Sequence, residues 1–414
     1  MSEIKDVEKF YDSVENRLEK ILNENIKPFW YPRTIDSENG GYYLNHDING
    51  KLIGKGTKMI VTQARMVWYF SQLFNTGWGG KEELEAAKHG YRFLRDHMWD
   101  LENGGFFWEV DHQGQVLKPD KVMYGQAFGL YALSEFAMAS KDQEALEMAL
   151  NLFNLMEKHS HDSLHGGYKE YFPKDWSTAT SIERKRFYFP PEFKSMNTHL
   201  HLLEALTTLY KATGDMLARE RLHELILILS NSVLRKNNGL CTETHHLDWT
   251  PLHGVRHDRV SYGHNLENIW LVAKACDLLK IPQSVLADFY KTVFAYSAKY
   301  GFDNKKGGVY ESGPINKPAD RLDKVWWIQA EALVCEAYMY HLTGEPSYLK
   351  YFAKTLDWIE KYQVDWKNGD WYSVVKPNGK AFGNKAGIWK AAYHNGRAMI
   401  EILTLLQEIR KKKE

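Results

Sequence analysis

Residues 104–108 read Gly104-Gly105-Phe106-Phe107-Trp108, a pair of glycines followed by an aromatic run. Glycine adopts positive φ at little cost, so the pair indicates a tight turn, and the aromatic residues indicate a short strand or hairpin after it. The pattern, with a Gly-Gly or Asn-Gly turn, begins at Gly40, Gly104, Gly166, Asn238, Gly307 and Asn368. Counted at their glycines (Gly40, Gly104, Gly166, Gly239, Gly307 and Gly369), the turns are spaced 62 to 73 residues apart. Such a period indicates a chain built from six repeats.

Two helical patterns lie between successive turns. The first helix of each repeat is expected near residues 60–76, 123–140, 195–213, 262–279, 325–343 and 389–409. The second is expected near 81–98, 142–159, 215–235, 283–299 and 345–363, and an N-terminal helix near 4–24 supplies the sixth. Stop signals such as Thr213-Gly214 and Thr343-Gly344 mark the ends of several first helices.

The two sets of helices differ in character. First helices such as residues 123–139 are apolar on most faces, whereas second helices such as residues 81–88 have a charged face. A helix that is apolar all round is buried, and an amphipathic helix lies outside. The sequence therefore predicts an all-α (α/α)6 barrel, a closed toroid of six inner and six outer helices with short β-hairpins in the loops. No linker divides residues 1–414, so we expect a single domain.

Composition excludes several classes of partner. Lys plus Arg equals Asp plus Glu at 53 each, which argues against nucleic acid or an anionic membrane as a partner. The charged N-terminus is unlike a signal peptide, and no window approaches the roughly 18 apolar residues of a membrane span. Three cysteines without a CxxC motif argue against a disulfide framework or zinc finger. We expect a soluble cytoplasmic protein, monomeric or homodimeric. The 14 Trp, 24 Tyr and 19 Phe suit a large core or a sugar-stacking surface.

The third inner helix begins with an unusual set of polar residues. Residues 194–205 read Lys-Ser-Met-Asn-Thr-His-Leu-His-Leu-Leu-Glu-Ala. Asn197 and His201 are four residues apart and share a helix face, whereas His199 points nearly opposite. We therefore expect Asn197 and His201 to face a substrate and His199 to have a structural role.

The other inner helices also place polar or aromatic residues near their starts. Because these starts meet at one mouth of a toroid, the residues are expected to form a common pocket. The set comprises Arg65, Tyr124, Asn197 with His201, His264 with Glu267, Trp326-Trp327 with Glu331, and Trp389 with His394 and Arg397. The pairs His264/Glu267, His394/Arg397 and Trp327/Glu331 have spacings that place both members on one face.

Each of these residues also has a plain structural interpretation. A lone inner-helix histidine is usually a hydrogen-bonded core residue, and Glu267 and Glu331 could simply pair within the barrel wall. At least one of the adjacent residues Trp326 and Trp327 is expected in the core. A buried Arg65 requires either a carboxylate or a ligand oxygen.

A second group of histidines looks metal-like but lacks the rest of a metal site. The group is His245, His246, His253 and His257. No cysteine or carboxylate cluster accompanies these residues at zinc spacing, so a polar loop over the pocket is the better interpretation. The sequence predicts no metal site.

Four motifs together resemble the N-acylglucosamine 2-epimerase superfamily, and within it the cellobiose 2-epimerases. They are Lys194-Ser195-Met196-Asn197-Thr198-His199-Leu200-His201, Gly263-His264-Asn265-Leu266-Glu267, Trp326-Trp327-x-Gln329-x-Glu331 and Trp389-x-x-x-Tyr393-His394-Asn395. The resemblance spans nearly the whole chain, and that family has an (α/α)6 barrel. Asn265-Leu266 and Ala391-Ala392 depart from the residues expected in typical members at these positions, but leave the histidines in place.

The resemblance implies cofactor-free epimerisation at C2 of a reducing-end glucose or mannose unit, with a disaccharide such as cellobiose or lactose as substrate. By position, His264 and His394 would be the acid/base pair and His201 a third essential histidine. Residues that would bind or orient the sugar are Arg65, Tyr124, Asn197, Glu267, Trp327, Glu331 and Trp389.

The chemistry of such a reaction agrees with these residue types. Removing a proton next to an aldehyde requires a nearby base and a stabilised oxyanion, and inversion requires proton return to the other face. Two imidazoles on different helices can do both near neutral pH. One of His264 and His394 would take the proton to give a cis-enediolate, and the other would return one. His394 is favoured for ring opening, Arg65 or His201 for the oxyanion, and Glu267 for orienting His264.

Three other functions compete with this interpretation. A monosaccharide 2-epimerase or an aldose–ketose isomerase, acting on mannose or N-acetylglucosamine types of sugar, would use the same groups. An (α/α)6 glycoside hydrolase would need a pair of carboxylates, for which Glu267 and Glu331 are available. A non-catalytic sugar- or protein-binding barrel would need no paired histidines.

Overall fold

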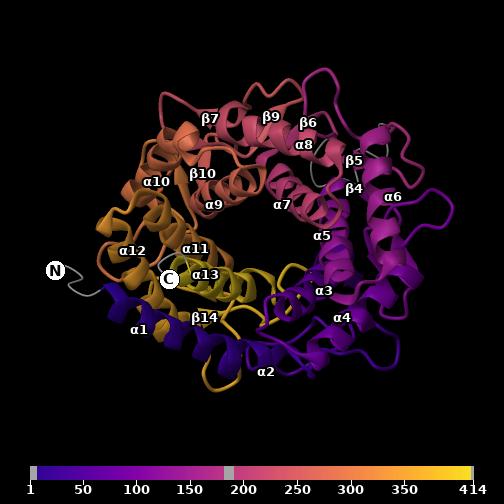
Figure 1. Cartoon of the computed structure of the whole chain (residues 1–414), viewed down its shortest axis with the longest axis horizontal. Helices are drawn as coiled ribbons and strands as arrows, with labels where there is room; N and C mark the ends of the chain where they lie inside the picture. Colours follow the sequence, from indigo (N-terminus) through magenta and orange to yellow (C-terminus); the bar gives the residue numbers. More distant parts are fainter. Residues whose placement is uncertain (1–6, 181–190, 412–414) are drawn as a thin grey trace.

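A computed structural model describes residues 7–180 and 191–411 of the chain. Within these residues, six helices form an inner ring and six form an outer ring, which confirms the predicted (α/α)6 barrel (Figure 1). The inner ring comprises α3 (Ile60–Asn75), α5 (Met123–Ser140), α7 (Met196–Thr213), α9 (Tyr262–Leu279), α11 (Trp326–Thr343) and α13 (Tyr393–Lys411). The outer ring comprises α1 (Val7–Lys20), α4 (Lys81–Phe93), α6 (Gln143–His159), α8 (Met216–Leu227), α10 (Ala287–Gly301) and α12 (Pro346–Trp358). The first three residues of the predicted 4–24 helix, and both ends of the predicted 1–414 domain, lie outside the described residues.

Contacts between neighbouring helices close the ring. Each inner helix packs against the next, and α13 packs against α3. Each outer helix packs against the inner helix of its own repeat, and α1 packs against α13. The first and last described helices of the chain therefore complete one repeat together.

Shorter helical segments extend the outer ring. The π-helical segments η2 (Leu94–Met98), η4 (Ile228–Ser232) and η6 (Ile359–Gln363) continue α4, α8 and α12, and the 3-10 segment η5 (Gln283–Leu286) precedes α10. Segment η1 (Ile21–Ile26) and helix α2 (Lys27–Trp30) follow α1. These segments account for most of the extra length predicted at 81–98, 215–235, 283–299 and 345–363.

Short antiparallel strands join the repeats where the inner helices begin. Strands β1, β4, β6, β10 and β12 directly precede inner helices and pair with β2, β5, β9, β11 and β13, respectively. The strands are β1 (Lys58–Met59), β2 (Glu109–Val110), β3 (Val116–Lys118), β4 (Lys121–Val122), β5 (Tyr171–Phe172), β6 (Phe193–Ser195), β7 (Leu234–Arg235), β8 (Leu240–Cys241), β9 (Thr244–His246), β10 (Arg259–Ser261), β11 (Ser312–Pro314), β12 (Lys324–Val325), β13 (Val374–Val375) and β14 (Ala381–Phe382). These pairings fix the starts of the inner helices relative to one another.

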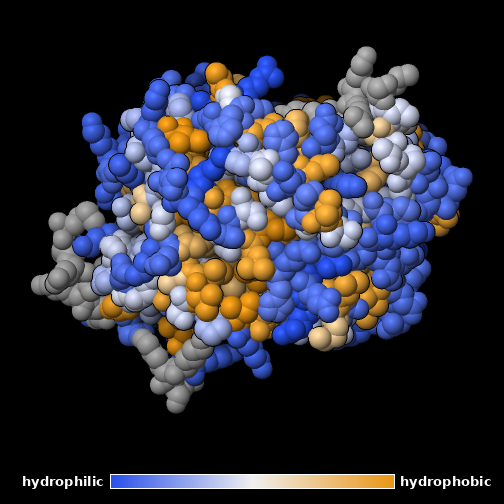
Figure 2. Space-filling view, turned by 90° about the horizontal axis from the view of Figure 1, so that it is seen from above, coloured by the Kyte–Doolittle hydropathy of each residue, from blue (hydrophilic) through white to orange (hydrophobic). Residues whose placement is uncertain are grey.

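Burial separates the two rings as the sequence predicted. In α5 every residue is buried except Tyr124, Met138 and Ser140, whereas α4 buries a single face. The surface in Figure 2 accordingly shows small groups of hydrophobic residues among hydrophilic ones. Across the described residues, every helix is too short or too polar to cross a bilayer.

Inner-helix side chains hold the glycine turns in place. Gln126 accepts a hydrogen bond from the backbone N–H of Phe106 and donates one to its carbonyl, both at 2.8 Å. Equivalent pairs of bonds join Gln63 to Tyr42, Asn265 to Cys241 and Gln329 to Val309. In the third repeat His199 takes this place. Each bond satisfies a buried backbone group that would otherwise have no partner.

A buried lysine fastens most of the same turns. In the second repeat, Lys121 binds Asp100 at 2.9 Å and the carbonyl of Gly105. Similar aspartate–lysine pairs are Asp36–Lys58, Asp162–Lys194, Asp303–Lys324 and Asp365–Lys385. In the fourth repeat Arg235 occupies the aspartate position and Val260 the lysine position, so this turn lacks the pair.

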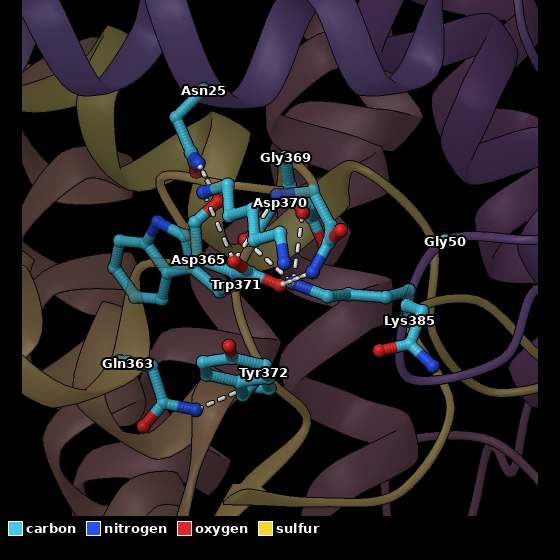
Figure 3. Close-up of polar contacts among 12 residues, drawn as sticks. Asn25, Gly50, Gln363, Asp365, Gly369, Asp370, Trp371, Tyr372 and Lys385 are labelled. Carbon is cyan, nitrogen blue, oxygen red and sulfur yellow. Dashed lines mark hydrogen bonds and ion pairs between the residues drawn. The ribbon is translucent and has the colours of Figure 1, made fainter.

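The sixth turn is also where the beginning of the chain meets its end (Figure 3). Asn25 of η1 donates to the carbonyl of Asp365 and accepts from the N–H of Asp370. Lys385 binds the carbonyls of Gly369 and Asp370 at 2.8 and 3.0 Å. The N-terminal segment is thus tied to the last turn by one side-chain and one backbone hydrogen bond of Asn25, as well as by helix packing.

One predicted boundary is wrong. The last inner helix begins at Tyr393 rather than near residue 389. Lys390 binds Asp370 and donates to the carbonyls of Trp371 and Lys385, and these contacts hold the chain before Tyr393 in a non-helical path. Trp389 therefore lies in the loop before α13.

Candidate active site at the starts of the inner helices

Side-chain contacts unite most of the predicted site residues where the inner helices begin. Arg65 of α3 donates to the Tyr124 hydroxyl of α5 at 3.1 Å, and the Tyr124 ring packs on His201 of α7. The Trp327 ring of α11 contacts both His264 of α9 and His394 of α13, with ring centroids 4.6 and 5.8 Å away, respectively. Tyr393 contacts the rings of both His201 and His394, so the three histidines belong to one site to which all six inner helices contribute.

Each of the three histidines is bound to a glutamate through Nδ1. The distances are 3.2 Å for His201–Glu204, 2.5 Å for His264–Glu243 and 2.6 Å for His394–Glu331. Among the hydrogen bonds of the described residues, Nε2 of each ring has no partner. A carboxylate at Nδ1 orients the imidazole and leaves Nε2 for proton exchange.

The surroundings give His264 and His394 opposite tendencies to bind a proton. Burial lowers the pKa of His264, but the carboxylates of Glu243, Glu267 and Glu331 together outweigh this effect and leave that pKa above its ordinary value. Burial, together with Arg65 and Arg397, holds the pKa of His394 well below its ordinary value. His264 therefore binds a proton more readily than His394.

Arg397, on the second turn of α13, is the charge that links the inner helices. Its Nη2 donates to Glu267 and to Glu331, both at 2.7 Å, and its Nη1 binds Glu204. Glu267 therefore pairs with Arg397, and the prediction that it orients His264 is wrong. Glu243 is the partner of His264, and sequence reasoning missed it because it lies 21 residues before the histidine.

Among the described residues, no carboxylate pairs with Arg65, so the ligand oxygen remains the partner predicted for it. It donates to the carbonyl of Trp389 at 3.0 Å and to Tyr124, and it lies over the rings of Phe128 and Tyr393. Its Nε is buried without a hydrogen-bond partner. The guanidinium is held by neutral groups, so its positive charge is available to an oxyanion.

Aromatic residues lie beside this cluster. Trp389 is 50% exposed, with its ring centroid 6.2 Å from that of Trp108. Trp326 and Trp327 are both partly buried and pack against the core. Asn197 lies one turn before His201, and its Oδ1 is buried without a hydrogen-bond partner.

His199 and His245 have structural contacts. His199 binds the carbonyl of Ser195 through Nδ1 and accepts from the N–H of Tyr168 at Nε2, which confirms its structural role. His245 was predicted in a polar loop, but it is a buried residue of β9, which pairs with β6. His245 is buried because β9 pairs with β6, the strand that directly precedes α7.

Glu267, Glu331 and His394 have ligand atoms within 4.8 Å of one another, close enough to bind a metal ion. Arg397 already donates to both carboxylates, and Nδ1 of His394 is bound to Glu331. A divalent cation there would face the guanidinium and would have to displace these bonds. The absence of a metal site stays a prediction.

Comparison with known proteins identifies the family. The model of the N-acylglucosamine 2-epimerase (GlcNAc 2-epimerase) family matches residues 41–398. The chain belongs to this family. It is 32% identical to the cellobiose 2-epimerase of Bacteroides fragilis over 394 residues, which covers 94% of this chain and 98% of that protein.

Two further family relatives place the chain among sugar isomerases. The structure of cellobiose 2-epimerase from Spirochaeta thermophila superposes with a TM-score of 0.86 at 32% identity, covering 98% of this chain and 100% of the other. The D-mannose isomerase of Marinomonas mediterranea is 26% identical, with 92% of this chain and 95% of that protein covered. The chain is an isomerase of the sugar 2-epimerase type.

Proposed function

We propose that the protein interconverts the glucose and mannose configurations at C2 of the reducing-end residue of β-1,4-linked disaccharides such as cellobiose and lactose. The observation that supports this most strongly is the pair His264 and His394, two imidazoles on different helices that flank Trp327. Each is oriented by a glutamate at Nδ1. An inversion needs two such groups, because the proton leaves one face of the carbon and returns to the other.

The reaction begins with opening of the sugar ring. An acid gives a proton to the ring oxygen while a base removes the proton of the anomeric hydroxyl, and the C1–O5 bond breaks to give the aldehyde. His394 suits this step because one proton lies between its Nδ1 and the Glu331 carboxylate. A shift of that proton along the hydrogen bond lets Nε2 give or accept a proton without leaving an unpaired charge.

Epimerisation then proceeds through a cis-enediolate. One histidine takes the C2 proton, the C–H electron pair forms the C1–C2 double bond, and the carbonyl electrons move to O1. Rotation about C2–C3 presents the other face, and the second histidine returns a proton to C2. The aldehyde re-forms and the ring closes, so no group is consumed.

Other residues of the site stabilise charge or hold the sugar. The Arg65 guanidinium lies beside Tyr124 and has no carboxylate partner among the described residues. Its positive charge can therefore stabilise the developing oxyanion. His201 is the third histidine with Nε2 available. Asn197 offers an unpartnered buried oxygen for a sugar hydroxyl. Trp389 and Trp108 present aromatic faces on which a second sugar ring could stack.

Two alternatives use the same site differently. An aldose–ketose isomerase would return the proton to C1, and the similarity to a D-mannose isomerase favours keeping this candidate. A glycoside hydrolase would require Glu267 and Glu331 as free carboxylates, but Arg397 binds both. The hydrolase is accordingly the weaker candidate.

The deciding experiment follows solvent deuterium into the sugar. The protein is incubated in D2O with cellobiose, lactose, glucose, mannose and N-acetylglucosamine, and NMR follows the C2 proton and the products. We expect deuterium at C2 and a mannose-type reducing end on the disaccharides. A ketose product or a strict preference for monosaccharides would indicate the isomerase or the monosaccharide enzyme. A sugar recovered without deuterium would indicate a binding protein.

The assignment of the histidines has its own test. His264→Ala and His394→Ala should each abolish turnover while the protein stays folded by circular dichroism. Substantial epimerase activity in either variant would refute the two-histidine mechanism.

A further inference from the structure

We propose that Arg397 is the positioning residue of this site: by binding three glutamates at once it holds His201 and His394 in working orientation and balances the charge around them. The proposal rests on the proposed epimerase function for its catalytic consequence, but not for its structural one. Arg397 is fully buried, so it acts through its neighbours rather than on the sugar.

Arg397 is connected to each of the two histidines through one glutamate. Glu204 binds Arg397 and Nδ1 of His201, and Glu331 binds Arg397 and Nδ1 of His394. Because Oε1 of Glu331 meets both Arg397 and His394, a shift of the guanidinium changes the acceptor that orients the ring.

His264 lies outside this arrangement. Its partner Glu243 is partly exposed, with 31% of the side chain accessible, and no described contact joins Glu243 to Arg397. His264 is therefore an internal control, since any effect transmitted by Arg397 should be stronger at His201 and His394.

The charges around the site show why an arginine is required. Glu204, Glu267 and Glu331 are at most 5% exposed, and Arg397 is the cation that forms ion pairs with all three. Oε2 of Glu267 has no hydrogen-bond partner, so its bond to Arg397 is the main compensation for its burial. Loss of one partner from a buried ion pair is strongly destabilising because the remaining charge is uncompensated.

Lysine would supply the charge without the geometry. The guanidinium divides its donors among three carboxylates and the Tyr393 hydroxyl, and it also lies over the rings of Tyr393 and Trp270. An ammonium is a compact point charge on a flexible stem and cannot reproduce this planar fork.

Every charged group around the two histidines bears on how they titrate. Burial lowers the pKa of His394 most, and Arg65, Arg397, His201 and His264 lower it further, while Glu331 is its hydrogen-bond partner. Around His201, burial lowers the pKa, Glu204 and Glu267 raise it, and Arg65 lowers it. Removing the charge of Arg397 should let the Glu331–His394 pair keep its proton to higher pH.

The test compares Arg397→Lys and Arg397→Gln with the control Arg410→Gln. Arg410 lies on the same helix but forms exposed ion pairs with Asp12 and Glu15. The readouts are kcat and KM for cellobiose across pH, and titration of 15N-labelled imidazoles by NMR without substrate, assigned with single histidine variants.

We expect both Arg397 variants to lose kcat, by about 100-fold for Arg397→Gln and about 10-fold or more for Arg397→Lys, with KM changed less than about threefold. The resonances of His201 and His394 should titrate at higher pH in Arg397→Gln and change tautomer in Arg397→Lys, while those of His264 move less. Arg410→Gln should match the parent protein in both readouts.

The two readouts separate two kinds of failure. If Arg397→Gln does not fold, Arg397→Lys still decides, because it keeps the buried charge. A folded Arg397→Lys with parental kcat and unmoved His201 and His394 resonances would overturn the proposal. A parent protein that lacks epimerase activity would refute the proposed function, while the imidazole titrations would still test the positioning role.

Discussion

The hydrogen bonds between inner-helix side chains and glycine turns can be tested by one nearly isosteric change, Gln126→Leu. Gln126 is fully buried, and its amide pairs with both the N–H and the carbonyl of Phe106. Leucine fills a similar volume but offers no polar atom. The variant therefore leaves two buried backbone groups without a partner and changes little else.

The expected loss of stability follows from counting these groups. An unsatisfied buried donor or acceptor costs about 1–3 kcal/mol, so the two together cost about 2–6 kcal/mol. Unfolding entropy of about 2.1 cal/mol/K per residue gives about 0.9 kcal/mol/K for 414 residues. The midpoint of thermal unfolding should therefore fall by about 2–7 °C.

The assay is differential scanning calorimetry of Gln126→Leu, the parent protein and Gln143→Leu at one scan rate. Gln143 lies on the outer helix α6, is exposed, and its side chain contacts Glu147. An exposed substitution of this kind changes stability by about 0.5 kcal/mol or less, so Gln143→Leu should move the midpoint by less than about 1 °C. Equal midpoints for the two variants would show that the bonds from Gln126 to its turn contribute no net stability.

Three further substitutions test the site and its surroundings. Glu243→Gln removes the carboxylate that raises the pKa of His264, so the limb of the kcat/KM–pH profile that reports His264 should move to lower pH, and two unmoved limbs would contradict the pairing. Burial lowers the pKa of His199 to about 3, whereas an unfolded histidine titrates near 6.5, so the unfolded state gains a proton, and the fold loses stability, as pH falls below about 6.5. The free energy of unfolding should fall between pH 7 and pH 5, and in His199→Gln this fall should be smaller by about 2 kcal/mol. Urea unfolding at both pH values measures it. Trp389→Ala should raise KM for cellobiose more than KM for glucose, and equal effects on both sugars would argue against a role in binding the second sugar.

The barrel was predictable because its signals are local. Apolar residues on all faces of residues 123–139, and stop signals such as Thr213-Gly214, depend only on neighbours in the sequence. In the structure α5 is buried almost throughout, and Gly214 ends α7 with a positive φ of 70°. An aspartate also lies four residues before five of the six turn glycines, but its lysine partner follows 20 to 32 residues later and is not a local signal.

The wrong predictions involve contacts between distant parts of the chain. Glu267 is one helical turn from His264, so proximity suggested a pair, but Arg397 binds Glu267 from 130 residues away. Glu243 reaches His264 only because the segment before β9 lies beside the start of α9. The loop around Trp389 has a sequence compatible with a helix, and its path is set by the contacts of Lys390 with residues near the sixth turn.

Arg397 lies on α13, the last inner helix to be made during protein synthesis, which has a consequence for folding. Glu204, Glu267 and Glu331 lie on α7, α9 and α11, which leave the ribosome earlier. Until α13 docks, the inner surfaces of these helices present three carboxylates that repel one another and lack their shared cation. Insertion of α13 closes the ring between α11 and α3 and supplies that cation in the same event. The docking that completes the ring therefore also supplies the contacts that orient His201 and His394.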